Sequence, residues 1–295
     1  MEQVSVQWFP GHMAKTRRLI QENLYLVDAI IEMRDARIPQ SSRNPELSRL
    51  IGKKPRLVLL NKSDAADPSV TAQWLNFLKN IGVPALAADC KSGKGLQKVI
   101  PAVKELLSDE IKRRAEKGMS GKPIRLMVVG IPNCGKSSFI NRMSGSRKAK
   151  VEDRPGVTRG KQWVNLENGI SLLDMPGVLW PKFEDKTVGE RLAFTGAVKD
   201  DIMDVQSLAM RLGSILRAEY SQLLCARYNL TPELINECDE AGLIELIAKK
   251  RGMLLSGGEI DTERASIMLL DEFRSGKLGR ISLEAPEKAE RSEQE

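Results

Sequence analysis

Residues 130–137 are Gly-Ile-Pro-Asn-Cys-Gly-Lys-Ser, and this octapeptide constrains the fold more than any other feature of the chain. It matches the pattern GxxxxGK(S/T) and lies between an apolar run at 124–129 and a helical pattern that begins near Lys136. Glycines in such a loop let backbone N–H groups surround phosphate oxygens, and the N-terminus of the helix favours an anion. We therefore expect a phosphate-binding loop, with contacts from Asn133, Cys134, Gly135, Lys136, Ser137 and Ser138.

Short apolar runs alternate with helical patterns over the first 180 residues, which predicts an α/β fold with a mostly parallel sheet and helices on both faces. The predicted strands are 27–33, 56–60, 84–88, 124–129, 163–166 and 170–173. From about residue 182 the pattern is almost wholly helical, at 205–220, 234–250 and 261–274. We expect an α/β domain over 1–180, an all-α domain over 181–283 and a disordered, charged tail over 284–295.

Two further elements follow the phosphate-binding loop. Asp174-Met-Pro-Gly177 comes directly after an apolar run, so Asp174 is expected to hold Mg²⁺ through water and the Gly177 N–H to contact the terminal phosphate. Thr158 lies in a polar stretch between these elements and is a candidate second Mg²⁺ ligand, beside Ser137. The alternative is an ordinary turn threonine.

Asn61-Lys62-Ser63-Asp64 follows the strand predicted at 56–60 and resembles an element that recognises guanine. A carboxylate such as Asp64 can accept from both N–H groups on the edge of guanine, while Lys62 covers the ring. The alternative for these four residues is a surface turn. One predicted strand later, Lys91 matches the supporting base-binding element, although Asp89 and Cys90 depart from its usual S-A-K pattern.

Composition narrows the class of protein. The chain of 295 residues has 41% hydrophobic residues and 29% charged residues, which is typical of a globular protein. No apolar run approaches the ~18–20 residues that cross a bilayer, the N-terminus does not resemble a secretory signal, and the four cysteines form no CxxC pair. We expect a soluble, cytoplasmic protein without a membrane span, a disulfide framework or a zinc site.

The net charge of +7 is unevenly distributed. Residues 1–180 hold 30 Lys and Arg against 17 Asp and Glu, a net +13, whereas residues 181–295 hold 16 against 22, a net −6. A basic first part suits a polyanionic partner such as nucleic acid, and a merely soluble basic protein is the alternative.

The order of these elements along the chain is similar to that in a known group of proteins. Conventional GTPases begin with the phosphate-binding loop, whereas here the base-recognition element comes first. The chain therefore resembles the circularly permuted P-loop GTPases, in particular those of ribosome biogenesis. Further matching segments are Trp8–Lys15, Asp35–Pro39, Gly177–Lys182, Ser256–Gly258 and Gly276–Arg280. The resemblance implies binding of GTP and GDP, hydrolysis of GTP, and a helical RNA-binding domain. It also implies a role in late maturation of the large (50S) ribosomal subunit, with binding to rRNA in the GTP state and release on hydrolysis.

The catalytic group is not the usual one. Conventional GTPases follow the DxxG element with a glutamine that orients water, whereas this chain has Val178, which has no polar side-chain atom. We therefore expect slow hydrolysis until the ribosomal subunit stimulates it. The resemblance assigns catalysis to the only histidine, His12, and K⁺ binding to Asn133. The alternatives are a structural role for His12 and an exposed loop amide for Asn133.

Candidate RNA contacts in the helical part are basic residues on or beside its helices. They are Lys249, Lys250, Arg251, Arg274, Lys277 and Arg280. Sparse aromatic residues favour contacts with phosphates of structured RNA over stacking on single-stranded bases. The sequence also leaves open a GTP-dependent RNA-modification factor and an RNA-binding scaffold with residual nucleotide binding. An adenine-nucleotide kinase is disfavoured by residues 61–64. We expect a monomer in solution.

Overall fold

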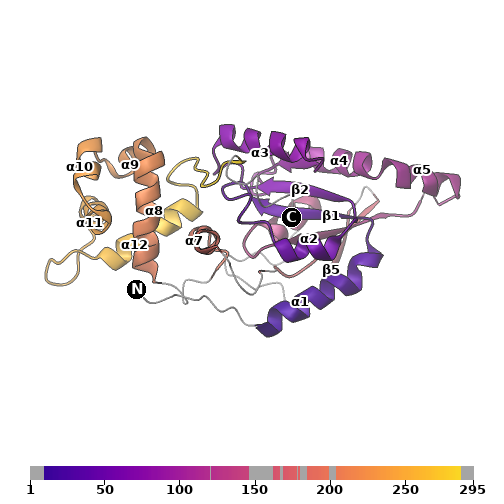
Figure 1. The fold of residues 1–295 in the computed structure, drawn as a ribbon, viewed down its shortest axis with the longest axis horizontal. Helices are drawn as coiled ribbons and strands as arrows, with labels where there is room; N and C mark the ends of the chain where they lie inside the picture. The colour runs from indigo at the N-terminus through magenta and orange to yellow at the C-terminus, as the bar shows by residue number, and fades with distance from the viewer. Residues whose placement is uncertain are drawn as a thin grey trace. The chain divides into compact units, whose positions relative to one another are not determined.

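The computed structural model describes residues 10–119, 121–145, 162–166, 169–177, 179, 185–198 and 204–286, with side chains from residue 17 onward. The described chain divides into two compact units. Among the described residues, one unit contains those from Pro10 to Asp185 together with those from Ser282 onward, and the other contains those from Lys186 to Ile281. Figure 1 shows that the first unit contains the sheet and the second contains only helices.

The first unit is built on a six-stranded sheet with the order β3-β2-β1-β4-β6-β5. Its strands are β1 (Ala29–Asp35), β2 (Arg56–Asn61), β3 (Ala85–Ala87), β4 (Ile124–Gly130), β5 (Gln162–Leu166) and β6 (Ile170–Asp174). All neighbours pair in parallel except β5, which runs antiparallel to β6. The six strands and the mostly parallel α/β fold predicted from the sequence are confirmed.

The helices of this unit each bury apolar residues, except the helix Ser108–Glu116, which has none buried. They are α1 (Pro10–Asn23), α2 (Pro45–Ile51), α3 (Pro68–Asn80), α4 (Val99–Leu106), α5 (Ser108–Glu116) and α6 (Lys136–Met143), with short 3-10 turns at Leu24–Leu26 and Leu96–Lys98. Asn44 and Asp67 cap α2 and α3 by accepting from backbone N–H groups of the first turn. In α3, Trp74 and Leu78 pack on Val58 and Leu60 of β2.

The carboxyl ends of the parallel strands meet at one edge of the sheet, which is where ligands bind in folds of this class. Asp35, Asn61, Gly130 and Asp174 are the last residues of β1, β2, β4 and β6. Asp35 and Asn61 are register partners in the β1–β2 ladder. Because β1 lies between β2 and β4, the loops that follow β2 and β4 start from nearby strand ends.

The second unit is all-α. Its helices are α7 (Lys186–Phe194), α8 (Val205–Glu219), α9 (Ser221–Tyr228), α10 (Pro232–Glu237), α11 (Glu240–Lys250) and α12 (Thr262–Arg274). The α8, α11 and α12 helices contact one another and form its core. The pattern at 234–250 was expected to be one helical patch, but it is divided between α10 and α11 because Asp239 caps the start of a new helix. Every helix that the structure describes is too short or too polar to cross a membrane.

The C-terminal segment returns to the first unit. A disordered tail was predicted from residue 284, yet Glu284 is buried and its carboxylate accepts from the backbone N–H groups of Gln40 and Ser41. The prediction of a tail start at 284 is therefore corrected: charge and the lack of aromatic residues did not reveal a glutamate that is held by backbone donors. The rest of the predicted tail, from residue 287, lies outside the described residues.

Candidate functional site

A buried amide joins the loops that follow β2 and β4. Asn61 is 3% exposed, and its Nδ2 donates to the backbone carbonyl of Cys134 at 2.8 Å. Its Oδ1 accepts from the backbone N–H of Cys90 at 3.0 Å. One side chain therefore links the predicted base-recognition element, the phosphate-binding loop and the loop that contains Lys91. The sequence assigned Asn61 to the base site, and the structure shows it bracing all three loops.

The phosphate-binding loop has the backbone that its sequence predicts. Gly135 has φ +96°, and a Cβ at this position would collide with Nδ2 of Asn61. Asn133 also has a positive φ, +56°, a conformation that non-glycine residues adopt uncommonly and often at functional sites. The loop ends at Lys136, the first residue of α6, so its backbone leads directly into a helix N-terminus.

The side chain of Lys136 lies close to the phosphate-binding loop and to the segment that follows β6. Its ammonium is buried and donates to the carbonyls of Gly130 at 3.2 Å and Ile131 at 2.8 Å. A Cβ on Gly177 would lie 3.1 Å from this Nζ and 2.9 Å from the backbone of Pro132. The structure therefore brings Lys136 and Gly177 together. Two groups that contact the same phosphate chain must lie this close to each other.

Asp174 supplies a carboxylate that suits a cation. It is 1% exposed, and its Oδ1 has no hydrogen-bond partner among the described residues. Burial raises its pKa to about 6, against the opposing effects of the Lys136 ammonium and the Met175 N–H. A bound Mg²⁺ would satisfy this oxygen and stabilise the ionised carboxylate. Ser137, the second residue of α6, is half-buried and would add a hydroxyl oxygen, so these residues fit an oxygen-ligated Mg²⁺.

Lys62 is held by a buried ion-pair network that the sequence analysis missed. Its Nζ lies 3.1 Å from Oδ2 of Asp35, and its backbone has φ +60°. The Arg37 guanidinium donates to both carboxylate oxygens of Asp35, at 3.0 and 2.9 Å. Burial alone would raise the pKa of Asp35, but Arg37 and Lys62 reverse this effect and hold the pKa well below its usual range. The sequence signal that could have revealed this network is Asp35 itself, an aspartate at the end of the strand next to β2.

The loop after β3 departs from the usual pattern for a structural reason. The Asp89 carboxylate is buried and accepts from the backbone N–H groups of Lys91 at 2.8 Å and Ser92 at 3.1 Å. Asp89 thus fixes the turn that carries Lys91. Lys91 and Asp64 are both exposed, which leaves their side chains accessible to a ligand.

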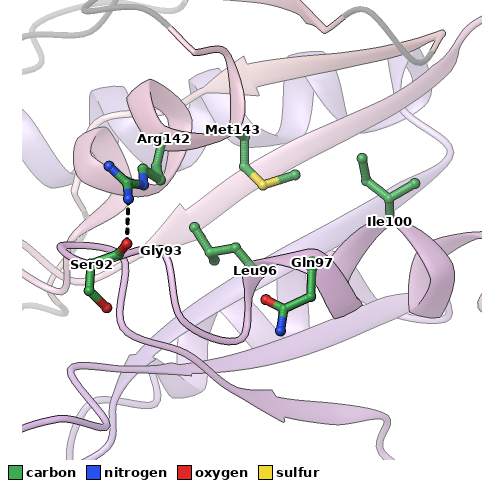
Figure 2. A pocket seen from close by; sticks show the side chains of 7 residues that line it. All are labelled: Ser92, Gly93, Leu96, Gln97, Ile100, Arg142 and Met143. Atoms are coloured by element: carbon green, nitrogen blue, oxygen red, sulfur yellow. Dashed lines mark hydrogen bonds between the residues drawn. The ribbon is translucent and has the colours of Figure 1, made fainter.

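A pocket of about 310 Å³ lies beside this turn, and Figure 2 shows the side chains that line it. Arg142, near the end of α6, donates to the carbonyl of Ser92, and Leu96 and Met143 line the hollow. The Arg142 contact ties the turn that carries Lys91 to the helix that begins at Lys136. It supports the same arrangement as the Asn61 bridge, from the other end of α6.

Several predicted site residues fall outside this description. Thr158 and Val178 lie outside the described residues, and so does the side chain of His12, whose backbone belongs to α1. The structure therefore brings together Asn61, Lys62, Gly135, Lys136, Asp174 and Gly177, while the predicted roles of His12 and Thr158 stay predictions.

The candidate RNA contacts separate into two groups. Arg274 is half-buried and donates to the carbonyls of Ala193 and Phe194 at the end of α7, which gives it a structural role. Arg251 stacks on the Tyr228 ring and donates to the carbonyl of Arg227. These two arginines were proposed from sequence as RNA contacts, but their guanidinium groups are engaged within the unit. Arg251 is nevertheless exposed, as are Lys249, Lys250, Lys277 and Arg280, so only Arg274 is half-buried.

Comparison with known proteins agrees with this geometry. A family model described as "50S ribosome-binding GTPase" matches residues 125–223. Ribosome biogenesis GTPase A from Priestia megaterium is 48% identical over 291 residues, which cover 97% of this chain and 99% of the relative. This chain belongs to the ribosome biogenesis GTPase A family. The GTPase activity and the family resemblance that the sequence predicts are therefore confirmed.

Two solved structures share the fold of this GTPase. The GDP-bound structure of TM YlqF has a TM-score of 0.65 and 29% identity, and the match covers 92% of this chain and 100% of that chain. The GNP-bound structure of YlqF from T. maritima has a TM-score of 0.63 and 29% identity, with 92% and 99% covered. Both neighbours were solved with a guanine nucleotide or analogue, in line with a nucleotide site in the shared fold.

Proposed function

We propose that this GTPase is an assembly factor for late maturation of the large (50S) ribosomal subunit, and that it acts in the cytoplasm as a monomer. In its GTP state it binds the immature subunit and its rRNA, and hydrolysis releases it. The observation that carries the nucleotide part is the Asn61 bridge between the loops after β2 and β4. Family membership and the "50S ribosome-binding GTPase" match support the ribosomal part.

The base of the nucleotide binds at the loops after β2 and β3. Asp64 accepts from the guanine edge, Lys62 covers the ring from its position on Asp35, and Lys91 closes the other side. Asn61 contributes to base binding indirectly, because it holds together the loops that carry the other residues. The positive φ of Lys62 and its ion pair with Asp35 support this assignment, because both fix the lysine before a ligand arrives.

The triphosphate binds over the loop 130–138. Backbone N–H groups of Asn133, Cys134, Gly135, Lys136, Ser137 and Ser138 surround the phosphates, the Lys136 ammonium contacts the outer phosphates, and the Gly177 N–H contacts the terminal phosphate. Ser137, Thr158 and Asp174 hold Mg²⁺, which neutralises charge on the phosphates when bound. The orphaned oxygen of Asp174 supports a cation at this position.

Water is activated by a group other than the residue at 178, because a valine can neither donate nor accept. We assign this role to His12, because an imidazole can accept a proton near neutral pH. Asn133 would hold K⁺, which would supply positive charge for catalysis when bound. The immature subunit accelerates hydrolysis by bringing His12 toward the terminal phosphate.

The test is the rate of GTP hydrolysis with and without purified large subunits, in K⁺ and in Na⁺. We expect stimulation by subunits, a faster rate in K⁺, and loss of the stimulated rate in His12→Ala with GTP affinity retained. Asp64→Asn should shift the preference of the protein from GTP to xanthosine triphosphate. Because both nucleotides are measured on the same variant, a general loss of folding lowers both affinities and does not produce this shift.

The outcomes separate the parts of the proposal. A His12→Ala protein that hydrolyses GTP normally on subunits removes His12 from catalysis. An Asp64→Asn protein that still prefers GTP removes residues 61–64 from base recognition. A wild-type rate that subunits leave unchanged favours an RNA-binding scaffold over an assembly GTPase.

A further inference from the structure

Residues Ser282–Glu284, here called the C-terminal strap, lie against two loops of the first unit. The Leu283 N–H donates to the carbonyl of Arg37 at 2.8 Å. The Ser282 hydroxyl accepts from the N–H of Asp67 at 3.1 Å, and the Trp74 indole donates to the carbonyl of Glu284 at 3.0 Å. The strap therefore bonds to the loop after β1 and to the start and first turns of α3.

The carboxylate of Glu284 anchors the strap. It is buried and accepts from the backbone N–H of Gln40 at 2.7 Å, from the N–H of Ser41 at 3.1 Å and from the Ser41 hydroxyl. Hydrogen bonds to an ionised acceptor are stronger than those between neutral groups. The strap is thus a built contact, and an accidental approach of a chain end would not satisfy three donors.

The loop that the strap braces is the one that positions Lys62. The Asp35 N–H donates to the Ser42 hydroxyl at 3.0 Å, which closes residues 35–42 into a turn. Within this turn, the Asp35 carboxylate holds Lys62, and Arg37 holds Asp35. Leu283 bonds to the carbonyl of the same Arg37.

The second contact of the strap lies three residues beyond Asp64. Asp67 caps α3 with its side chain, and its backbone N–H is taken by Ser282. The intervening turn is closed by the Ala65 N–H, which donates to the carbonyl of Lys62 at 3.0 Å. Residues on both sides of the base-recognition element are therefore fixed, one through the turn 35–42 and the other through the start of α3.

We propose that the C-terminal strap is a positioning element for guanine recognition, with Glu284 and Ser282 as its positioning residues. The strap fixes the two loops that present Lys62 and Asp64, so its contacts set the affinity for the guanine base. This inference rests on the base-binding roles given under the proposed function. By linkage, a bound guanine nucleotide stabilises the strap by the same factor.

The experiment compares Glu284→Gln and Ser282→Ala with the wild-type full-length protein, using GDP and inosine diphosphate, which lacks the 2-amino group of guanine. The matched control is Glu272→Gln, which alters another buried carboxylate, one that accepts from Arg227 and Tyr228 in the helical unit. Titration calorimetry gives the Kd of each nucleotide, and steady-state hydrolysis gives KM and kcat.

We expect Glu284→Gln to raise the Kd for GDP by at least about 5-fold, the lower limit of typical coupling between sites. The ratio of GDP to inosine diphosphate affinity falls, KM for GTP rises, and the basal kcat is unchanged. Ser282→Ala has the same direction with a smaller change. Glu272→Gln lowers thermal stability and leaves both nucleotide affinities unchanged, since a purely structural loss does not alter base discrimination.

Unchanged Kd values in both strap variants, with a wild-type preference for GDP over inosine diphosphate, overturn the strap proposal and leave the base site intact. A wild-type protein with no such preference overturns the base site, and the strap proposal with it. If Glu284→Gln does not fold, Ser282→Ala decides the question. Amide exchange at Leu283 in the wild type gives a further decision, because the proposal requires GDP to slow it and an unchanged rate contradicts it.

Discussion

The side-chain amide of Asn61 donates to the backbone carbonyl of Cys134 at 2.8 Å, although the two residues are 73 positions apart in the sequence. The same side chain accepts from the N–H of Cys90. In this permuted chain the base-recognition element and the phosphate-binding loop come from distant segments, and Asn61 is where they meet. One buried amide therefore joins the predicted base-recognition and phosphate-binding segments.

Asn61→Ala is expected to weaken GDP binding and to destabilise the fold. The variant leaves the Cys134 carbonyl and the Cys90 N–H buried without their partner, which costs about 1–3 kcal/mol. Urea unfolding measures the loss of stability, and calorimetry at a temperature where the variant is folded measures affinity. Wild-type GDP affinity in a folded Asn61→Ala protein would contradict the bridging role.

Gly135→Ala is expected to abolish GTP binding. Its φ of +96° strains any L-residue, and the added Cβ collides with Nδ2 of Asn61, so the loop cannot keep its shape. Gly145→Ala is the matched control, because Gly145 has φ +63° and open space around its Cβ position. Both variants carry backbone strain of about 1–2 kcal/mol, but only the first should lose hydrolysis. Equal GTPase activity in the two variants would show that the collision with Asn61 has no effect of its own on hydrolysis.

Asp174→Asn is expected to raise the Mg²⁺ concentration needed for half-maximal hydrolysis by about 10–100-fold. The amide keeps the shape of the side chain but removes the charge beside the orphaned oxygen. A Mg²⁺ titration of the GTPase rate measures the effect, and a chelator should stop wild-type hydrolysis. Asp204→Asn serves as the control, since Asp204 caps α8 in the other unit. An unchanged Mg²⁺ requirement in Asp174→Asn would exclude Asp174 from the metal site.

The ion pairs of Asp35 predict a pH dependence of stability. The folded pKa of Asp35 lies well below its ordinary value of 3.8, so its stabilising charge is fully present above that value and is lost as the pH falls toward the folded pKa. Asp35→Asn removes a buried partner of Arg37 and should cost about 3–5 kcal/mol near neutral pH. We expect this difference to be constant between about pH 5 and 7 and to shrink below about pH 4. Denaturant unfolding of both proteins across pH tests it, and a difference that grows at low pH would be inconsistent.

Replacement of both Lys249 and Lys250 by alanine is expected to weaken binding to rRNA without loss of stability, because both side chains are exposed. If each contacts one phosphate, the slope of log affinity against log salt falls by about 1.4–1.8. Arg274→Ala should instead lower the melting temperature, since Arg274 bonds to the end of α7. Filter binding at several salt concentrations and thermal unfolding separate the two effects. Weaker rRNA binding in Arg274→Ala, together with a lower melting temperature in the double lysine variant, would contradict this division of the basic residues.

The strands and the phosphate-binding loop could be predicted because each has a local signal. Residues 57–60 are an apolar run between Arg56 and Asn61, and 130–137 combine glycines with a lysine at fixed spacing. These patterns fix backbone shape by short-range interactions. The mostly parallel order followed from the alternation of strands with helices.

The support of the site could not be predicted in the same way. The pairs Asp35–Lys62 and Leu283–Arg37 join residues that are distant in the sequence, and no spacing rule connects them. Glu284 has the charge expected of a tail residue and becomes a buried anchor only because Gln40 and Ser41 point donors at it. The basic residues of the helical unit were likewise indistinguishable by sequence, although Arg274 caps a helix and Lys250 is exposed.

The position of β1 in the sheet has a consequence for synthesis of the chain. Translation completes β1, β2 and β3 before β4 begins at Ile124, so β1 is an open edge of a nascent half-sheet until its neighbour emerges. Glu32 and Arg34 lie within this strand, and charged side chains on an open edge oppose pairing with a foreign strand. The charges buried in the finished enzyme are thus expected to disfavour pairing of the unfinished sheet with a foreign strand.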